Sequence, residues 1–288
     1  MSFSQDVKEE LSRHVSSARH CQLAELAAMM HFCGQYGRDR EGNCIIGFQT
    51  ENEAVSRKGF TLLKKTYNIN TGVGIDEEQM TDILSKIGDL DEPVSALLIK
   101  NACCQRAFLR GAFLSVGSIS DPAKSYHLEF VCTDPRKAKQ LQSVMRDFGI
   151  EAKIVLRKKY HVVYLKEGES IVDLLNVCEA HVALMEFENL RILKEMRNSV
   201  NRRVNCEAAN ITKTVNAATR QIEDIEYIRD CGGLHQLPDN LREMAEVRLE
   251  YPDASLKELG EYLNPPVGKS GVNHRLRKLS EYAEKLRT

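Results

Sequence analysis

Residues 1–180 carry an order of hydrophobic patterns that occurs twice, about 80 residues apart. Each half opens with a strongly apolar helix rich in small residues and continues with a strand, an amphipathic helix, a further strand region and a closing helix. In the first half we expect these elements at 21–36, 44–52, 53–66, 70–75 and 77–87, with a turn at 37–43. In the second half we expect them at 103–116, 124–132, 135–148, 152–165 (a hairpin) and 169–178, with a turn at 118–122.

This repetition predicts an α+β domain made by internal duplication, preceded by a short helix at 6–15. Each half would be a curved sheet with helices on one face, and the two apolar helices would pack together at a pseudo-two-fold axis. The alternative is two unrelated core helices. The first half is the shorter, because between Tyr67 and Glu77 its pattern accommodates a single brief strand.

The chain beyond residue 180 reads as all-α. A long basic helix is expected over 180–204 and a further helix over 208–228, ended by the glycine pair at 232–233. Three helices follow in quick succession, at 237–252, 254–263 and 270–286, and the last two are separated by a break with two prolines. We therefore predict a domain at 1–180, a basic linker helix at 181–204 and a helical domain at 205–288, with a helix-turn-helix at 254–287.

The last helix has one apolar stripe and one polar, basic face. Ser255 and Glu258 predict a capping box at the start of the preceding helix. A short helix, a tight turn and a second helix with a polar N-terminal half is the arrangement that places the second helix in the major groove of DNA. We predict that the following residues contact DNA: Lys269, Ser270, Asn273, His274, Arg275, Arg277 and Lys278.

These seven residues divide by the chemistry of their side chains. Asn273 can pair with adenine and Arg277 with guanine. Lys269, Arg275 and Lys278 are expected at phosphates, which set affinity and salt dependence. A helical module that docks on a protein partner would show a similar pattern, so patterning leaves both interpretations open.

Composition narrows the function classes only slightly. The chain has 288 residues, of which 42% are hydrophobic and 28% charged, and its net charge of −1 favours neither nucleic acid nor membrane. The distribution of charge is more informative, because 191–220 carry seven basic and two acidic side chains, 230–263 three and eight, and 264–288 six and two. Such segregation indicates that particular faces meet phosphate, although solvated helix faces would show it too.

The spacing of the cysteines and the sequence of the N-terminus indicate the cellular compartment and whether a metal or cofactor is expected. Nine cysteines are scattered without a Cys-x-x-Cys pair, which is typical of reduced, mostly buried thiols. There is neither an apolar run of 18 residues nor a signal-peptide pattern at the start. We therefore expect a cytoplasmic, nucleoid-associated protein with no metal, no cofactor, no membrane contact and no small-molecule substrate.

Three segments resemble the WhiA family of DNA-binding proteins of Gram-positive bacteria: SFSQDVKEEL (2–11), NCEAANITKTVNAATRQIEDIEYI (205–228) and ASLKELGEYLNPPVGKSGVNHRLRKL (254–279). The resemblance implies an N-terminal domain like LAGLIDADG homing endonucleases, joined to a helix-turn-helix like region 4 of sigma factors. It also implies a transcription factor that acts in cell division, chromosome segregation and sporulation.

The same resemblance implies where a nuclease would hold its metal. In homing endonucleases each apolar helix ends in an acidic residue that binds the divalent cation. Here Cys33 and Val116 take those places, and neither suits Mg²⁺, which prefers oxygen ligands. Asp39 and Asp121 lie a few residues further on, where we expect them to serve turns. We therefore predict a catalytically inactive domain and a protein that is not an enzyme.

Two surfaces of the first domain leave alternatives open. The basic hairpin RKKYHVVYLK (157–166) would either touch DNA or form a solvated sheet edge. A domain retained without its metal site would also suit docking of a transcription or cell-division protein. His31, on the first apolar helix, is expected to be a satisfied core histidine. The favoured function is a sequence-specific regulator that binds double-stranded DNA; the alternatives are protein docking and a residual metal-dependent nuclease.

Overall fold

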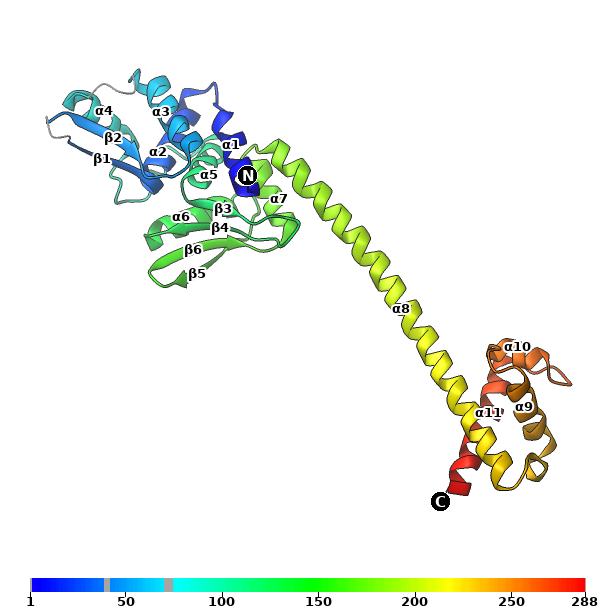
Figure 1. Ribbon diagram of the computed structural model, residues 1–288. Helices are drawn as coiled ribbons and strands as arrows, with labels where there is room; N and C mark the ends of the chain where they lie inside the picture. Colours follow the sequence, from blue (N-terminus) through cyan, green and yellow to red (C-terminus); the bar gives the residue numbers. More distant parts are fainter. Residues whose placement is uncertain (1, 39–41, 70–74, 288) are drawn as a thin grey trace. The chain divides into compact units, whose positions relative to one another are not determined.

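A computed structural model of the chain describes residues 2–38, 42–69 and 75–287. It divides into two compact units, Met1–Met196 and Arg197–Thr288 (Figure 1). The boundary falls inside the segment predicted as a basic linker helix. In the described part of the chain, every helix is too short or too polar to cross a lipid bilayer.

The first unit is an α+β structure with two antiparallel sheets. Its helices are α1 (Phe3–Arg13), α2 (Arg19–Cys33), α3 (Glu53–Tyr67), α4 (Glu77–Ile87), α5 (Ala102–Val116), α6 (Pro135–Arg146), α7 (Gly168–Val177) and the start of α8 (His181–Cys231). Its strands are β1 (Gly34–Arg38), β2 (Cys44–Phe48), β3 (Gly117–Ile119), β4 (Leu128–Cys132), β5 (Lys153–Arg157) and β6 (Tyr160–Leu165). The predicted α+β fold with two helix-and-sheet halves is confirmed.

The two halves differ in the size of their sheets. Strands β1 and β2 form a two-stranded sheet in the first half, to which Ile75 adds one bridge at Cys44. The second half has four strands in the order β3-β4-β6-β5. The smaller first sheet agrees with the short pattern between Tyr67 and Glu77, although most of the strand expected at 70–75 lies outside the described residues.

Each apolar helix passes directly into a strand, which corrects the predicted helix end at 36 and the starts of the two predicted turns, because residues 37–38 belong to β1 and residues 118–119 to β3. Gly34 and Gly117 follow the last helical residues with extended backbones (φ −74° and −81°). A Cβ at Gly34 would lie 2.5 Å from Met30 Cα, and one at Gly117 would lie 2.5 Å from the Phe113 ring. Glycine therefore permits a helix-to-strand change without a loop, and this is a steric requirement that periodicity does not reveal.

The predicted packing of the two apolar helices on each other is confirmed, and they lie side by side in Figure 1. Their backbones approach closely at Gly111, where a Cβ would lie 2.5 Å from the Glu25 carbonyl oxygen and 2.9 Å from Ala28 Cβ. A larger residue at 111 would push the helices apart. The small residues of both helices thus serve this contact.

An ion cluster is buried beside this contact. Glu25 of α2 accepts from Arg110 of α5 through Nε at 3.1 Å and Nη2 at 3.2 Å, and its Oε1 lies 2.9 Å from Lys58 Nζ of α3. Arg110 Nη1 also donates to Glu179 at 2.5 Å, and Lys58 donates to the His14 carbonyl oxygen. The Glu25 and Lys58 side chains are fully buried. The cluster therefore ties three helices together in the core of the first unit.

Helix α8 is continuous from His181 to Cys231, so the predicted break between residues 204 and 208 is wrong. No glycine or proline interrupts this stretch of sequence, and the intervening Asn205, Cys206 and Glu207 are only mildly unfavourable in a helix. The predicted break had no residue that would stop a helix.

The second unit is all-α, as predicted. It contains the rest of α8, a short 3-10 helix (Leu234–Gln236), α9 (Asp239–Glu250), α10 (Leu256–Glu261) and α11 (Lys269–Arg287). Its core is formed by Ile225, Ile228, Leu237, Leu241, Met244, Ala245, Leu259, Leu263, Val272, Leu276, Leu279 and Ala283. The end of α11 is fixed to α8, because Arg287 Nη1 lies 2.9 Å from the buried carboxylate of Asp224.

Candidate nucleic-acid interface

Helices α10 and α11 and the turn between them form the predicted helix-turn-helix. The capping box at the start of α10 is present: Glu258 N donates to Ser255 Oγ at 3.4 Å, and Ser255 N donates to the Glu258 carboxylate at 2.7 Å. In the turn, Val267 N donates to the Gly260 carbonyl oxygen at 2.9 Å. A Cβ at Gly260 would lie 2.0 Å from the Val267 carbonyl oxygen, so glycine is required for this close approach.

Helix α11 divides into a buried stripe and an exposed face. Val272, Leu276, Leu279 and Ala283 are all buried, as their spacing predicts. Six of the seven residues predicted to contact DNA lie on the opposite, exposed side of the N-terminal half: Lys269, Ser270, Asn273, His274, Arg277 and Lys278. The fold therefore brings amide, hydroxyl, imidazole and basic groups together on one surface, which we call the α11 face.

Arg275 is the exception among the seven. Its side chain is 19% exposed and turns toward α9, where Nη1 lies 3.7 Å from the Glu243 carboxylate and donates to the Asn240 carbonyl oxygen at 3.4 Å. The other oxygen of Glu243 accepts from Asn264 N at 2.8 Å, at the start of the turn. Arg275 thus helps to hold α9, the turn and α11 together, and its geometry suits a positioning role more than the phosphate contact predicted from the sequence.

Arg277 lies on the α11 face in a loose ion pair. Its Nε donates to Glu281 Oε1 at 3.1 Å, one turn along the helix, and both side chains are well exposed. Exposed pairs of this kind contribute about 0.3–0.5 kcal/mol. The guanidinium can therefore exchange this carboxylate for a base edge or a phosphate at little cost.

Arg248 of α9 is a candidate that the sequence patterning missed. It is 3% exposed, its Nη1 donates to the Ala254 carbonyl oxygen at 2.7 Å, and its Nε has no protein partner. Burial lowers the pKa of this guanidinium, and Asp253 opposes the shift; an arginine nevertheless stays charged at neutral pH. Arg248 lines a pocket with Lys213, Ser255 and Asn273, next to the α11 face.

The spacing of residues in α9 already places Arg248 on the buried face of the helix. Leu241, Met244, Ala245 and Arg248 fall at i, i+3, i+4 and i+7, so a charged residue occupies a core position of an otherwise amphipathic helix. A buried cation with an unsatisfied nitrogen that lines a pocket is suited to an anionic group such as a phosphate oxygen.

The helix ends that would hold the metal of a nuclease lie in the first unit. Cys33 and Val116 are the final residues of α2 and α5, and Cys33 is 8% exposed. Burial raises the pKa of the Cys33 thiol, and the nearby Lys8 ammonium lowers it. A thiol, a valine and a cation do not form an oxygen-rich site for Mg²⁺.

The other candidates of the first unit have structural partners where they are described. Asp121 accepts from Ala123 N at 2.8 Å within its turn, whereas Asp39 lies outside the described residues. The ring nitrogens of His31 lie 2.8 and 2.9 Å from the carbonyl oxygens of Glu92 and Ile87, which confirms a satisfied core histidine.

The basic hairpin is formed by β5 and β6 at the edge of the four-stranded sheet, where Arg157 pairs with Glu129 at 3.2 Å. DNA contact and a solvated edge both remain predictions for it.

Comparison with known proteins gives matches along nearly the whole chain. Three family models match in order: the WhiA N-terminal LAGLIDADG-like domain over residues 19–82, the WhiA LAGLIDADG-like domain over 105–197 and the WhiA C-terminal HTH domain over 200–283. The chain is 52% identical over 313 residues to the probable cell division protein WhiA of Lachnoclostridium phytofermentans, with both chains fully covered. It is 51% identical over 315 residues to the protein of the same name from Alkaliphilus oremlandii, covering 99% of this chain and 98% of the other.

The fold is also similar to a solved structure. Full-length DUF199/WhiA from Thermatoga maritima matches with a TM-score of 0.59 and 27% identity, covering 99% of both chains.

Proposed function

Since the chain belongs to the WhiA family, we propose that it is a sequence-specific double-stranded DNA-binding protein that regulates transcription in connection with cell division, chromosome segregation and, where it occurs, sporulation. The α11 face carries this proposal, because it gathers Asn273, Arg277 and Lys278 on the exposed side of the second helix of a helix-turn-helix. In such motifs the N-terminal half of this helix reads base edges in the major groove. The protein would act at the nucleoid in the cytoplasm.

We assign separate tasks to the residues of the α11 face. Asn273 and Arg277 read bases, each bidentate pair giving about 1–3 kcal/mol of discrimination. Lys269 and Lys278 bind phosphates, with Ser270 and His274 adding hydrogen bonds to bases or backbone. We extend the predicted set with Arg248, whose buried Nε lacks a protein partner.

The experiment first selects a DNA site with the full chain from random duplexes. Fluorescence anisotropy then compares the selected and a scrambled duplex for the wild type, for Asn273→Ala/Arg277→Ala, and for Lys285→Ala. Lys285 is a charge-matched control, because it is an exposed cation of the same helix about two turns beyond Arg277. We expect the double variant to lose its preference for the selected duplex and the control to keep it. An unchanged preference in the double variant would refute the assignment.

We propose further that the first unit does not cut DNA. The positions of the metal-binding acids hold Cys33 and Val116, so two-metal phosphodiester cleavage lacks its ligands. Incubation of the full chain with supercoiled DNA and Mg²⁺ should leave the DNA intact. Site-specific cleavage by two separately purified proteins, the wild type and Lys285→Ala, would overturn this proposal, because a contaminating nuclease would not be expected in both preparations.

A second candidate function is docking of a transcription or cell-division protein by the first unit. One observation favours it: within the first unit, five large apolar side chains of α8 are each at least 50% exposed and share one face of the helix, namely Val182, Met185, Ile192, Leu193 and Met196. Met185→Glu/Leu193→Glu should abolish co-purification of a cellular partner while DNA binding by the α11 face persists. If every partner of the wild type is retained, this face is not the docking site.

A further inference from the structure

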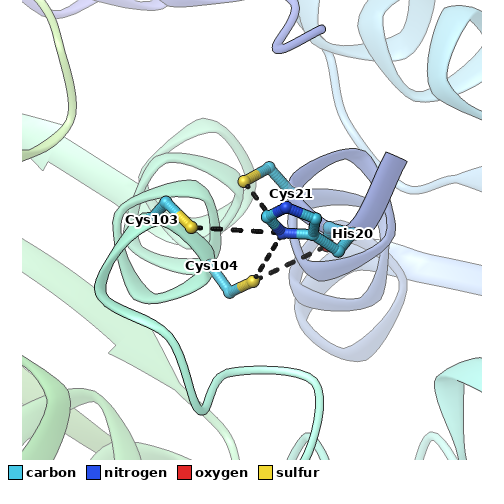
Figure 2. Close-up of side chains that lie close together, drawn as sticks. All are labelled: His20, Cys21, Cys103 and Cys104. Carbon is cyan, nitrogen blue, oxygen red and sulfur yellow. Dashed lines mark hydrogen bonds between the residues drawn. The ribbon is translucent and has the colours of Figure 1, made fainter. Parts of the chain in front are cut away.

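Four side chains that can bind a metal converge where the N-terminal ends of α2 and α5 meet (Figure 2). They are His20, Cys21, Cys103 and Cys104, and their ligand atoms all lie within 4.8 Å of one another. His20 Nδ1 lies 3.2 Å from Cys104 Sγ, 3.4 Å from Cys21 Sγ and 4.0 Å from Cys103 Sγ. One imidazole nitrogen therefore faces three sulfur atoms.

The cluster follows the internal duplication of the fold. His20 and Cys21 are the second and third residues of α2, and Cys103 and Cys104 are the second and third residues of α5. Each half thus contributes two consecutive residues from the same place on its apolar helix. Because the helices pack against each other along their length, equivalent positions at their N-terminal ends come together.

The nitrogen-to-sulfur distances are close to those around a tetrahedral zinc ion. Zinc binds thiolate sulfur at about 2.3 Å and imidazole nitrogen at about 2.0–2.1 Å, so ligand atoms at tetrahedral angles are separated by about 3.6 Å (N to S) and about 3.8 Å (S to S). The three nitrogen-to-sulfur distances range from 3.2 to 4.0 Å. All four ligand atoms lie within 4.8 Å of one another, so side-chain shifts of up to about 1 Å would bring them to the separations that a tetrahedral zinc ion requires.

Hydrogen bonds alone do not account for this convergence. A neutral imidazole has a single acceptor nitrogen, and it can accept one hydrogen from one thiol at good geometry. Three sulfur atoms face that nitrogen, and two of the cysteines, Cys21 and Cys104, are buried. A disulfide would join two of the sulfurs and would leave the third sulfur and the imidazole without a role. A Cys₃His set is instead a recognised ligand combination of structural zinc.

The cluster lies at the N-terminal ends of two helices. Neither helix has a side-chain cap at its N-terminus, and neither has an acidic residue in its first turn. The positive ends of both helix dipoles therefore face the sulfur atoms. These dipoles oppose the effect of burial, which raises the pKa of the Cys21 and Cys104 thiols.

We propose that His20 Nδ1 and the thiolates of Cys21, Cys103 and Cys104 bind one Zn²⁺ ion as a closed structural site. On binding, three thiol protons leave to solvent and four bonds to the ion form, with no change in oxidation state. The ion joins the two halves of the first unit at the ends of α2 and α5 opposite to Cys33 and Val116. This proposal differs from the expectation, drawn from the sequence, that the chain binds no metal. That expectation rested on the absence of a Cys-x-x-Cys pair, whereas the ligands proposed here are two adjacent pairs that lie about 80 residues apart in the sequence.

The test begins with the metal content of the full chain, purified without a histidine tag and dialysed against a weak chelator. Elemental mass spectrometry should find one zinc per chain in the wild type. The variant Cys103→Ser/Cys104→Ser should lose this equivalent, and Cys132→Ser, which removes a buried cysteine of the same unit outside the cluster, should keep it. Zinc retained by the double variant would overturn the assignment of ligands.

A second measurement on the wild type does not depend on whether a variant folds. The zinc is removed by a strong chelator under reducing conditions, and Co²⁺ is added. Tetrahedral Co²⁺ with thiolate ligands gives visible d–d bands and near-ultraviolet sulfur-to-metal charge-transfer bands, which should saturate at one equivalent and disappear when Zn²⁺ is added. A purified chain with no zinc and no such spectrum, or one in which any two of Cys21, Cys103 and Cys104 form a disulfide under native conditions, would refute the proposal.

Discussion

Glu25 holds the buried ion cluster of the first unit together, and its removal gives a prediction with a calculable size. In Glu25→Gln the shape of the side chain is kept, but Lys58 loses the carboxylate 2.9 Å from its Nζ. Arg110 keeps Glu179 as a partner at 2.5 Å, whereas Lys58 retains only the His14 carbonyl oxygen. The substitution therefore leaves one fully buried ammonium without a counter-ion.

The free-energy penalty of burying this uncompensated ammonium cannot exceed the cost of deprotonating Lys58, because the folded variant can release the proton instead. In the wild type burial already lowers the pKa of Lys58, and Glu25 opposes the shift. An unfolded lysine has a pKa near 10.4, so deprotonating it at pH 7 costs about 3.4 pKa units at 1.36 kcal/mol each, or about 4.6 kcal/mol. Removing one partner of a buried ion pair typically costs 3–5 kcal/mol. We expect Glu25→Gln to lower the free energy of unfolding by about 4–5 kcal/mol at pH 7.

The pH dependence of this penalty tests its origin. In the variant, the unfolded state binds a proton at Lys58 that the folded state lacks, so its stability rises with pH. In the wild type the Glu25 carboxylate, 2.9 Å from Nζ, favours the charged form of Lys58 in the folded state, so this pH dependence is weaker there. The penalty should therefore shrink by up to about 1.4 kcal/mol over this unit of pH.

The assay is urea denaturation of the full chain, followed by circular dichroism at pH 7 and pH 8. The transition of the first unit is identified as the one that a core substitution in the second unit, Leu276→Ala, leaves in place. Glu92→Gln is the control, because Glu92 pairs with Arg136 on the surface and its removal should cost little at either pH. A penalty below about 1 kcal/mol, or one that does not shrink with pH, would show that Lys58 is not left uncompensated.

Three further predictions concern the second unit. Gly260→Ala should destabilise the helix-turn-helix by about 1–3 kcal/mol, because its Cβ would meet the Val267 carbonyl oxygen; an unchanged melting curve in calorimetry would contradict this. Asp224→Asn should weaken the contact with Arg287 and lower the free energy of unfolding by about 1–2 kcal/mol, a value kept small because the arginine is partly exposed. Amide hydrogen exchange at the end of α11 should become faster, and unchanged protection there would contradict the prediction. Lys278→Ala should weaken binding to all duplexes alike and reduce the slope of log K against log salt by about 1, whereas a loss confined to the selected duplex would make Lys278 a base-reading residue.

The sequence by itself determined the local features of the chain. The apolar stripe from Val272 to Ala283 and the capping box of Ser255 and Glu258 both depend on residues within a few turns, so periodicity and spacing were enough to predict them. The duplicated order of helices and strands was likewise visible, because each element carries its own pattern. Similarity along the chain extended this to the family and to the LAGLIDADG-like fold.

Features that depend on contacts between distant segments were decided only by the tertiary structure. Arg275 matches the basic pattern of the α11 face, yet its place beside the buried stripe turns it to Glu243 on another helix. The spacing of α9 places Arg248 at a core position, but only the tertiary packing shows that its Nε is buried without a partner. Periodicity tells which face of a helix is buried, but the neighbour that covers that face comes from the packing of other elements. The cluster of His20, Cys21, Cys103 and Cys104 shows this most clearly, because its two halves meet only when α2 and α5 pack along their length.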